Sequence, residues 1–271
     1  MKNKFNITEF RCLAGENWLG SEILYLDSVE STNSFLKDLD HEKISHGMMA
    51  LTDDQSNGRG QFRKKWYSEP GQNLTFTLLF IPSRAEGLML LTVAAASAIS
   101  KVIEEYTGIS SVVKWPNDIF LNGKKIGGVL TECLFMGTKP ERVLLGIGLN
   151  INQVNFSGEL EKTATSLKKE TGKNFSRERI LSRVLSAIQH AYGRWHKKDS
   201  NLPVEVNKSI EGYGEWVSVT LNGEMQDGCF KFLGINERGV CLMLNEELDV
   251  NTFSHEQIRI STGSKRISET A

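Results

Sequence analysis

Paired cysteines and metal-ligand spacings are missing from this sequence. Four cysteines occur in 271 residues, and none of them forms the C-x-x-C spacing of zinc ribbons and redox motifs. The five histidines show no metal-ligand spacing either, and we interpret them as surface or helix residues. We therefore expect no metal site held by the protein alone. A cytoplasmic location, where thiols stay reduced, is the simplest one for single cysteines.

A long apolar run and an excess of one charge are also absent. The longest apolar-rich stretch, residues 88–99, is shorter than a membrane span, and residues 1–20 lack the pattern of a secretory signal. Lys and Arg number 32 and Asp and Glu 33, which gives a formal net charge of -1. Because coating DNA or an anionic membrane requires an excess of cations, the sequence argues against both tasks.

Three common motifs of catalysis and nucleotide binding do not occur. The sequence has no G-x-x-x-x-G-K-[ST] loop, no G-x-G-x-x-G fingerprint and no G-x-S-x-G elbow. It has the composition of an ordinary globular protein, with 39% apolar and 24% charged residues. Its length suits one large domain with a small one attached.

Residues 1–211 are predicted to form an α+β domain. Ser31, Thr32 and Asn33 mark a helix start, because short polar side chains cap free backbone N–H groups. Apolar residues at helical spacing predict helices over 88–106 and 180–195. Apolar and β-branched runs predict strands over 73–81, 111–115, 119–121, 124–132 and 142–151. The Asn122-Gly123 turn signal favours a mixed or antiparallel sheet with packed helices over a chain of βαβ units.

Residues 212–271 have a different character. Short strand-like runs alternate with turn signals, and no helical spacing interrupts them. This pattern predicts a small all-β domain, such as a little barrel. The strands are expected over 216–221, 229–235, 239–244 and 257–260.

A basic loop, GRGQFRKKW at residues 58–66, is the first candidate for chemistry. Glycines let a backbone approach a ligand closely, and four cations lie within nine residues of a nearly neutral chain. The loop therefore suits a small phosphate-bearing molecule, with Trp66 covering an aromatic group. A solvated basic loop with a structural tryptophan fits the same pattern.

Two further segments follow an apolar strand and a hairpin turn. In KWPND, residues 114–118, Pro116 marks the exit of the strand, and polar side chains at such an exit often face a ligand. In KKIGG, residues 124–128, two glycines follow Lys125 and suit close packing against a ligand. A plain turn and an exposed lysine pair are the alternative for both.

Two polar patterns are weaker signals. A helix cap explains Ser31, Thr32 and Asn33 fully. GIGLNIN, residues 146–152, places glycines and two amides in an apolar strand, which marks either a bulge or the close approach of a ligand.

Taken together and in this order, these segments resemble the biotin protein ligases (biotin–[acetyl-CoA carboxylase] ligases). The resemblance covers roughly residues 25–155, and KWPND is its most specific part. It implies the catalytic fold of biotin and lipoate ligases, followed by a small SH3-like domain. It also implies that biotin reacts with ATP and Mg²⁺ to give biotinyl-5′-AMP and pyrophosphate, and that a lysine of a biotin carboxyl carrier protein then accepts the biotinyl group.

The resemblance assigns roles to residues of this sequence. It implies catalytic roles for Lys125, Arg59 and Asp118, with Asp118 helping to order magnesium or the incoming lysine. The implied biotin-binding residues are Ser31, Thr32, Asn33, Gln55, Arg59, Lys125, Gly128, Leu130 and Gly146. The implied nucleotide-binding residues are Gly58, Gly60, Gln61, Lys65, Trp66, Lys114, Asn117 and Asn150. Because the adenylate is reactive, residues 58–66 and 155–165 are expected to become ordered around it and exclude water.

The sequence also departs from the family pattern. Some members carry arginine at the position of Gln61 and glycine at that of Arg63, so a cationic contact to the intermediate is either missing here or supplied by Arg63 or Lys64. Some relatives begin with a helix-turn-helix domain and repress biotin genes, whereas here the first motif begins at Ser31. We expect a monofunctional ligase that binds neither DNA nor membranes. The family permits a homodimer, but no residue here decides the oligomeric state.

Two other functions stay open at this point. A lipoate–protein ligase shares the fold and the adenylation chemistry, but lacks this Gly-Arg-Gly loop joined to KWPND. A nucleic-acid-binding module would use residues 59–65 as its basic patch, although the overall charge argues against it.

Overall fold

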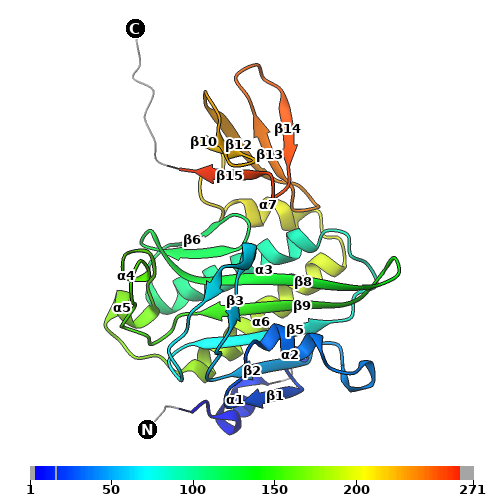
Figure 1. Ribbon diagram of the computed structural model, residues 1–271, viewed down its shortest axis with the longest axis vertical. Helices are drawn as coiled ribbons and strands as arrows, with labels where there is room; N and C mark the ends of the chain where they lie inside the picture. The colour runs from blue at the N-terminus through cyan, green and yellow to red at the C-terminus, as the bar shows by residue number, and fades with distance from the viewer. Residues whose placement is uncertain (1–3, 16, 263–271) are drawn as a thin grey trace.

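A seven-stranded sheet forms the larger part of the molecule (Figure 1). The computed structural model describes residues 4–15 and 17–262, apart from the side chain of Arg63. The strand order is β1-β2-β5-β9-β8-β7-β6, with β1 and β2 parallel and every other neighbouring pair antiparallel. The strands are β1 (Ile23–Leu26), β2 (Met49–Thr52), β5 (Leu74–Phe80), β6 (Ser111–Lys114), β7 (Asp118–Leu121), β8 (Lys124–Met136) and β9 (Lys139–Leu149). The predicted mixed sheet is confirmed.

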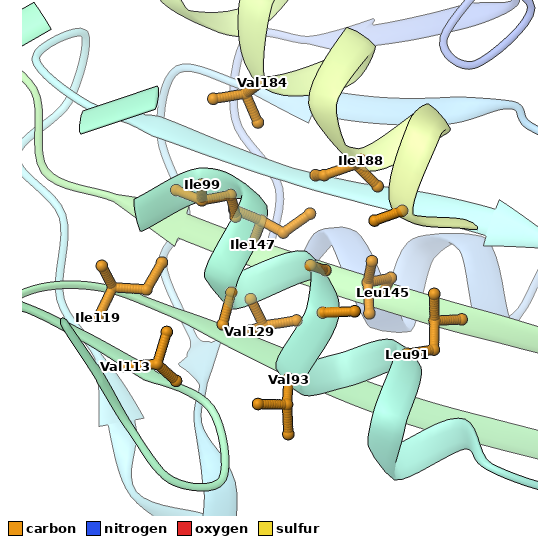
Figure 2. Packing of buried hydrophobic residues seen from close by; sticks show 14 of the residues in the cluster. Leu91, Val93, Ile99, Val113, Ile119, Val129, Leu145, Ile147, Val184 and Ile188 are labelled. Atoms are coloured by element: carbon orange, nitrogen blue, oxygen red, sulfur yellow. The ribbon is translucent and has the colours of Figure 1, made fainter. Parts of the chain in front are cut away.

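The two longest helices cover one face of this sheet. The helices are α1 (Ile7–Ala14), α2 (Thr32–Lys37), α3 (Leu88–Thr107), α4 (Leu160–Thr163), α5 (Leu167–Thr171), α6 (Arg177–His196) and α7 (Asn201–Asn207), with short 3₁₀ turns η1 (His41–Lys43) and η2 (Gln61–Arg63). Figure 2 shows α3 and α6 packing their apolar side chains against β8 and β9. None of the helices in the described residues is long and apolar enough to cross a membrane.

Alternation along the central strands separates the core face from the opposite face. In β5, Phe76 and Leu78 point into the helix-covered core, so Thr75 and Thr77 point to the other side. In β9, Leu145 and Ile147 lie in the core, so Gly146 and Gly148 face away from it. The short helix α2 covers only part of this second face, through a separate small cluster around Leu36, Leu79 and Leu144. The helix α2 leaves the rest of this face uncovered, and the candidate site described below lies there.

Local turn chemistry fixes the strands that carry the KWPND and KKIGG segments. Asn122 and Gly123 both have positive φ, +49° and +72°, so they make the predicted two-residue turn between β7 and β8. The pairing of these strands shifts register between Ile119 and Phe120, which is a β-bulge. Asp118 is therefore paired with Gly128, while Phe120 is paired with Lys125.

The C-terminal part is a six-stranded antiparallel sheet, consistent with the expected SH3-like domain. Its strands are β10 (Trp216–Leu221), β11 (Glu224–Met225), β12 (Phe230–Ile235), β13 (Cys241–Leu244), β14 (Val250–Phe253) and β15 (Ile258–Ser261). Phe232 and Ile235 belong to the same apolar cluster as the core of the large sheet. The Asn207 amide joins the two parts, because it donates to the Ile235 carbonyl at 3.0 Å and accepts from the Ile235 N–H at 2.8 Å. The boundary at residue 212 stays a prediction.

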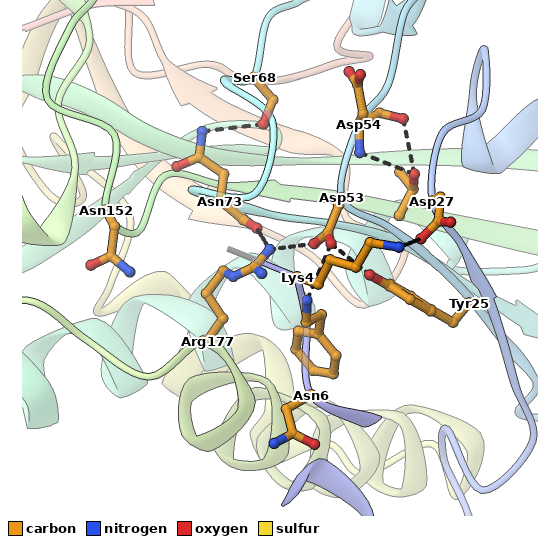
Figure 3. Close-up of polar contacts among 12 residues, drawn as sticks. Lys4, Asn6, Tyr25, Asp27, Asp53, Asp54, Ser68, Asn73, Asn152 and Arg177 are labelled. Carbon is orange, nitrogen blue, oxygen red and sulfur yellow. Dashed lines mark hydrogen bonds and ion pairs between the residues drawn. The ribbon is translucent and has the colours of Figure 1, made fainter. Parts of the chain in front are cut away.

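A buried ion pair supports the turn that follows β2 (Figure 3). The Arg177 guanidinium of α6 lies 2.6 Å from the Asp53 carboxylate, with side chains 3% and 10% exposed. The same carboxylate accepts from the Tyr25 hydroxyl at 2.5 Å and from the Phe5 N–H at 3.1 Å. Three distant segments thereby fix the chain just before Gln55.

Candidate active site

The open face of the large sheet borders a cavity of about 680 Å³. Two segments complete its walls: the hairpin of β3 (Gly58–Arg59) and β4 (Lys65–Trp66), and residues 156–164. Every predicted site residue except Gly58 lines this cavity. They are Ser31, Thr32, Asn33, Gln55, Arg59, Gly60, Gln61, Lys65, Trp66, Lys114, Asn117, Asp118, Lys125, Gly128, Leu130, Gly146 and Asn150. The fold thus brings together segments that are more than 100 residues apart.

A polar group at the start of α2 occupies one end of the cavity. Ser31 caps the helix, because its hydroxyl accepts from the Ser34 N–H. The Gln55 side-chain oxygen accepts from the Thr32 N–H at 2.9 Å, and lies 3.4 Å from the Thr32 hydroxyl. The Thr77 hydroxyl lies 2.7 Å from Thr32 Oγ1 and 2.6 Å from Asn33 Oδ1. Since a hydroxyl has one hydrogen, it can donate to only one of these oxygens at a time.

Two glycines of β9 make room for side chains from other segments. A Cβ at Gly146 would lie 2.2 Å from Asn33 Oδ1, and a Cβ at Gly148 would lie 2.3 Å from the Trp66 ring. Both distances are far shorter than van der Waals contact. The strand therefore needs glycine at both positions, and the pattern GIGLN reflects a close approach rather than a bulge of β9 against β8.

Two cations of the cavity are paired with carboxylates. Arg59 Nη2 lies 3.0 Å from Glu132 Oε2, which also accepts from the Asn33 amide at 2.7 Å. Lys125 Nζ lies 2.6 Å from Asp118 Oδ1. These side chains are between 28% and 38% exposed, so the cations remain accessible to an anion that enters the cavity.

The position of Lys125 follows from the bulge and from the segment that covers it. The Lys125 carbonyl accepts from the Thr165 N–H at 2.9 Å, which ties the segment after α4 to β8. The side-chain Nζ of Lys125 lies 6.0 Å from the centre of the Trp66 ring. The lysine is therefore tied to the segment before Thr165 through its backbone and lies near the basic loop through its side chain.

Amides and aromatic rings make up another part of the cavity lining. The Asn117 amide donates to the Val129 carbonyl at 2.7 Å, and the Asn150 amide donates to the Thr165 carbonyl at 3.0 Å. Lys114 Nζ lies 5.5 Å from the centre of the Phe120 ring. Four buried polar atoms of lining residues have no hydrogen-bond partner: Trp66 Nε1, Thr75 Oγ1, Trp115 Nε1 and Asn150 Oδ1. Buried polar atoms in folded proteins are rarely left unpaired. Four such atoms around one cavity are therefore typical of a site that a polar ligand fills.

Gly58 and the two candidate cations Arg63 and Lys64 differ in their relation to the cavity. Gly58 does not line the cavity; a Cβ there would lie 2.5 Å from both Gln55 Nε2 and the Trp66 carbonyl, so this glycine serves packing beneath the site. The side chain of Arg63 lies outside the described part of the structure, while Lys64, the other candidate for the missing cation, lines the cavity.

Comparisons with known proteins agree with this geometry. Residues 25–150 match the model of the biotin/lipoate A/B protein ligase family. The bifunctional ligase/repressor BirA of Bacillus spizizenii is 30% identical over 249 residues, which span 90% of this chain and 76% of that relative. The chain belongs to the biotin protein ligase family. The solved structure of the Aquifex aeolicus biotin protein ligase in complex with biotin and ATP has a TM-score of 0.76 and 30% identity, and the match covers 89% of this chain and 100% of that one.

Another relative is named for the ligase activity alone, as the resemblance implied. The biotin–[acetyl-CoA-carboxylase] ligase of Paracoccus denitrificans is 31% identical over 158 residues, covering 56% of this chain and 64% of the relative. Membership of this family favours biotin over lipoate as the acid that is activated. The expected absence of DNA binding stays a prediction, since another relative is a bifunctional ligase/repressor.

Sequence reasoning missed several residues of this ligase site. Thr75 and Thr77 are two polar residues two positions apart in an apolar strand, and that spacing was a readable signal that they share a face. Phe62 and Arg259 also line the cavity, but they are nearly 200 residues apart in the sequence. No local pattern could have brought those two together.

Proposed function

We propose that this protein activates biotin with ATP and transfers the biotinyl group to a lysine of a biotin carboxyl carrier protein. The observation that carries the proposal is the set of groups gathered in one cavity. Thr32 and Gln55 supply hydrogen-bonding groups, Arg59 and Lys125 supply cations, and Asn117 and Asn150 supply amides. This set suits a ring with polar groups, two reacting anions and a nucleoside.

In the first step, the biotin carboxylate attacks the α-phosphorus of ATP. The new bond joins a carboxylate oxygen to phosphorus, and pyrophosphate leaves. Both reactants are anions, so fixed cations must offset their repulsion and the charge that builds up in the transition state. Lys125 serves this purpose between the two anions, and Arg59 holds the intermediate from the basic loop. Trp66 covers the adenylate, and its unpaired indole N–H is a donor for it.

In the second step, the amine of the carrier lysine attacks the activated carbonyl carbon, and AMP leaves. The amine must be neutral to attack, and the new amide nitrogen must lose a proton. Asp118 is a carboxylate at the reacting end of the cavity, 2.6 Å from Lys125. It orients Lys125 and stands beside the path of the incoming amine.

The residues also fit a magnesium ion that enters with ATP. Magnesium prefers oxygen ligands and is commonly held by one or two carboxylates together with substrate phosphates. The described residues contain no group of three or more His, Cys, Asp or Glu side chains that could hold a metal ion by themselves. Asp118 is the carboxylate that could add to the phosphate oxygens, and the ion would help to neutralise the leaving pyrophosphate.

The test of this function is a titration with biotin, ATP and a carrier domain, read by the mass of the product. The proposal predicts that the carrier gains one biotinyl group on one lysine, and that the gain requires both small molecules. Lipoate supplied in place of biotin separates the related function. A carrier that gains lipoyl and not biotinyl groups would overturn the proposal.

A nucleic-acid-binding module remains the second function to exclude. Arg59, Lys64 and Lys65 line the cavity, which suits a small anion, although all three residues are also exposed. Salt-dependent binding of duplex DNA, lost on changing Lys64 and Lys65, would favour the module.

We also propose a cytoplasmic location, a homodimer and two domains, residues 1–211 and 212–271.

A further inference from the structure

Phe62 stands at the tip of the basic loop in an unusual conformation. Its φ is +54°, in the left-handed region that bulky residues seldom adopt, and its side chain is 52% exposed. A strained backbone persists only where surrounding contacts hold it. The loop's own support is short: β3 and β4 pair over two residues each, the Gly60 N–H donates to the Lys64 carbonyl, and the Lys64 N–H donates to the Gln61 carbonyl.

The contact that Phe62 makes comes from the C-terminal sheet. The Arg259 guanidinium carbon lies 4.4 Å from the centre of the Phe62 ring, within the range of a cation–π interaction. The centre of the His255 ring lies 6.3 Å from the centre of the Phe62 ring. Among the described residues that line the cavity, Arg259 alone belongs to the C-terminal sheet.

Arg259 lies in a paired strand, whereas the loop tip has few backbone bonds of its own. It sits in β15, where Ile258 and Arg259 pair with Leu221 and Thr220 of β10, and Ile258 is buried. The guanidinium also donates to the carbonyls of His255 and Ile258. In Figure 1 the C-terminal sheet lies at the end of the molecule beyond α7, and β15 is its strand nearest to α7 in that view.

We propose that Arg259 is a positioning residue that acts through Phe62, and that the two form a clamp between the C-terminal sheet and the basic loop. The clamp keeps Arg59 and Trp66, which flank Phe62 in the loop, over the cavity. Its consequence for chemistry rests on the proposed function: a closed loop keeps water away from the adenylate. Hydrolysis adds water to the carbonyl carbon and breaks its bond to the phosphate oxygen, giving biotin and AMP.

The first test measures closure of the loop in the protein without substrates. Trypsin can cut at the four basic residues within 58–66, and the rate of cutting follows the open population when opening is fast. For Arg259→Met we expect cutting within this loop to be about two- to fivefold faster, the change that corresponds to an exposed cation–π contact. An unchanged rate would overturn the clamp.

Matched variants separate the clamp from damage to the C-terminal sheet. Arg238→Met removes another exposed arginine of the same part of the chain, which lies 3.8 Å from Glu86, and should leave the rate unchanged. Phe62→Leu changes only the loop tip and should match Arg259→Met, whereas Phe62→Tyr keeps an aromatic face and should retain most of the protection. The double variant Arg259→Met/Phe62→Leu should be no faster than either single variant. Additive effects would contradict a shared contact.

The second test measures escape of the intermediate. With biotin and ATP but no carrier, AMP release should rise about two- to fivefold in Arg259→Met and in Phe62→Leu, and Phe62→Tyr should restore the slow release. If the unaltered protein forms no adenylate, the proposed function fails, while the trypsin rates still decide whether the clamp exists. Faster trypsin cutting with unchanged AMP release would refute the role in shielding.

Discussion

At the scale of single residues, two of the cations that line the cavity are already paired with carboxylates. Lys125 is bonded to Asp118, and Arg59 to Glu132, before any substrate enters. Each carboxylate orients the cation that it is paired with. An anion that enters the cavity then bonds to the same cation as the carboxylate does. The sequence indicated both cations through their motifs. It did not indicate Glu132 as the partner of Arg59, since that pairing spans 73 positions.

Replacing Lys125 should remove the adenylation activity with little effect on folding. For Lys125→Ala we expect biotin-dependent ATP–pyrophosphate exchange to fall by about 10² to 10³, the range for losing one electrostatic contact to a transition state. Lys124→Ala is the control, because Lys124 precedes it in β8 and does not line the cavity. Near-normal exchange in Lys125→Ala would show that the charge acts elsewhere.

Replacing Thr32 should weaken biotin binding. Its hydroxyl lines the cavity beside Gln55, so Thr32→Ala leaves a polar group of the bound biotin ring short of a partner and should cost about 1–3 kcal/mol of binding free energy. Ser31, not Thr32, is the helix cap. Calorimetric titration with biotin gives the Kd, and an unchanged Kd would limit Thr32 to packing.

At the scale of elements, strong periodicity was predictable and weak local signals were not. The helices α3 and α6 and the hairpin β7–β8 lie where apolar spacing and the Asn122-Gly123 turn placed them. The short strands β1 and β2 were missed, because four residues carry too little pattern and their pairing is parallel through α2. β14 was missed too, since three of its four residues are exposed. Packing of distant segments, not local propensity, stabilises these strands.

The buried pair of α6 with the turn after β2 should dominate the stability of that element. Arg177→Met leaves the Asp53 carboxylate buried without its cation, and we expect a loss of about 3–5 kcal/mol in the free energy of unfolding. Arg183→Met, on the same helix, breaks a bidentate pair with Glu105 whose side chains are both 48% exposed, and should cost about 1 kcal/mol or less. Urea denaturation measures both, and equal losses would contradict this view.

At the scale of the whole molecule, the small sheet is joined to the large one through a common core. Val217 and Phe232 belong to the same apolar cluster as Phe76 and Trp195, and Asn207 bonds both backbone groups of Ile235. The composition change near residue 212 predicted a separate β-rich unit. It could not predict this continuity, because the contacts join residues far apart in the sequence.

Acid should weaken this molecule partly through His46. We expected the histidines on the surface or in helices, and His46 is exposed, but one face of its ring stacks on Trp18 with the ring centres 5.0 Å apart. Burial, and then the charge of His196, lowers its pKa, and burial also lowers the pKa of His255. Below about pH 6.5 the unfolded chain therefore binds more protons than the folded one. The melting temperature should fall between pH 7.5 and 5.5, and less so in His46→Asn; the same fall in both would contradict this assignment.

The most direct test of the central claim is biotin-dependent exchange of labelled pyrophosphate into ATP by the purified protein. The account predicts exchange that needs biotin, is not supported by lipoate, and is lost in Lys125→Ala but kept in Lys124→Ala. A folded protein that shows no exchange with biotin, or exchange only with lipoate, would contradict it.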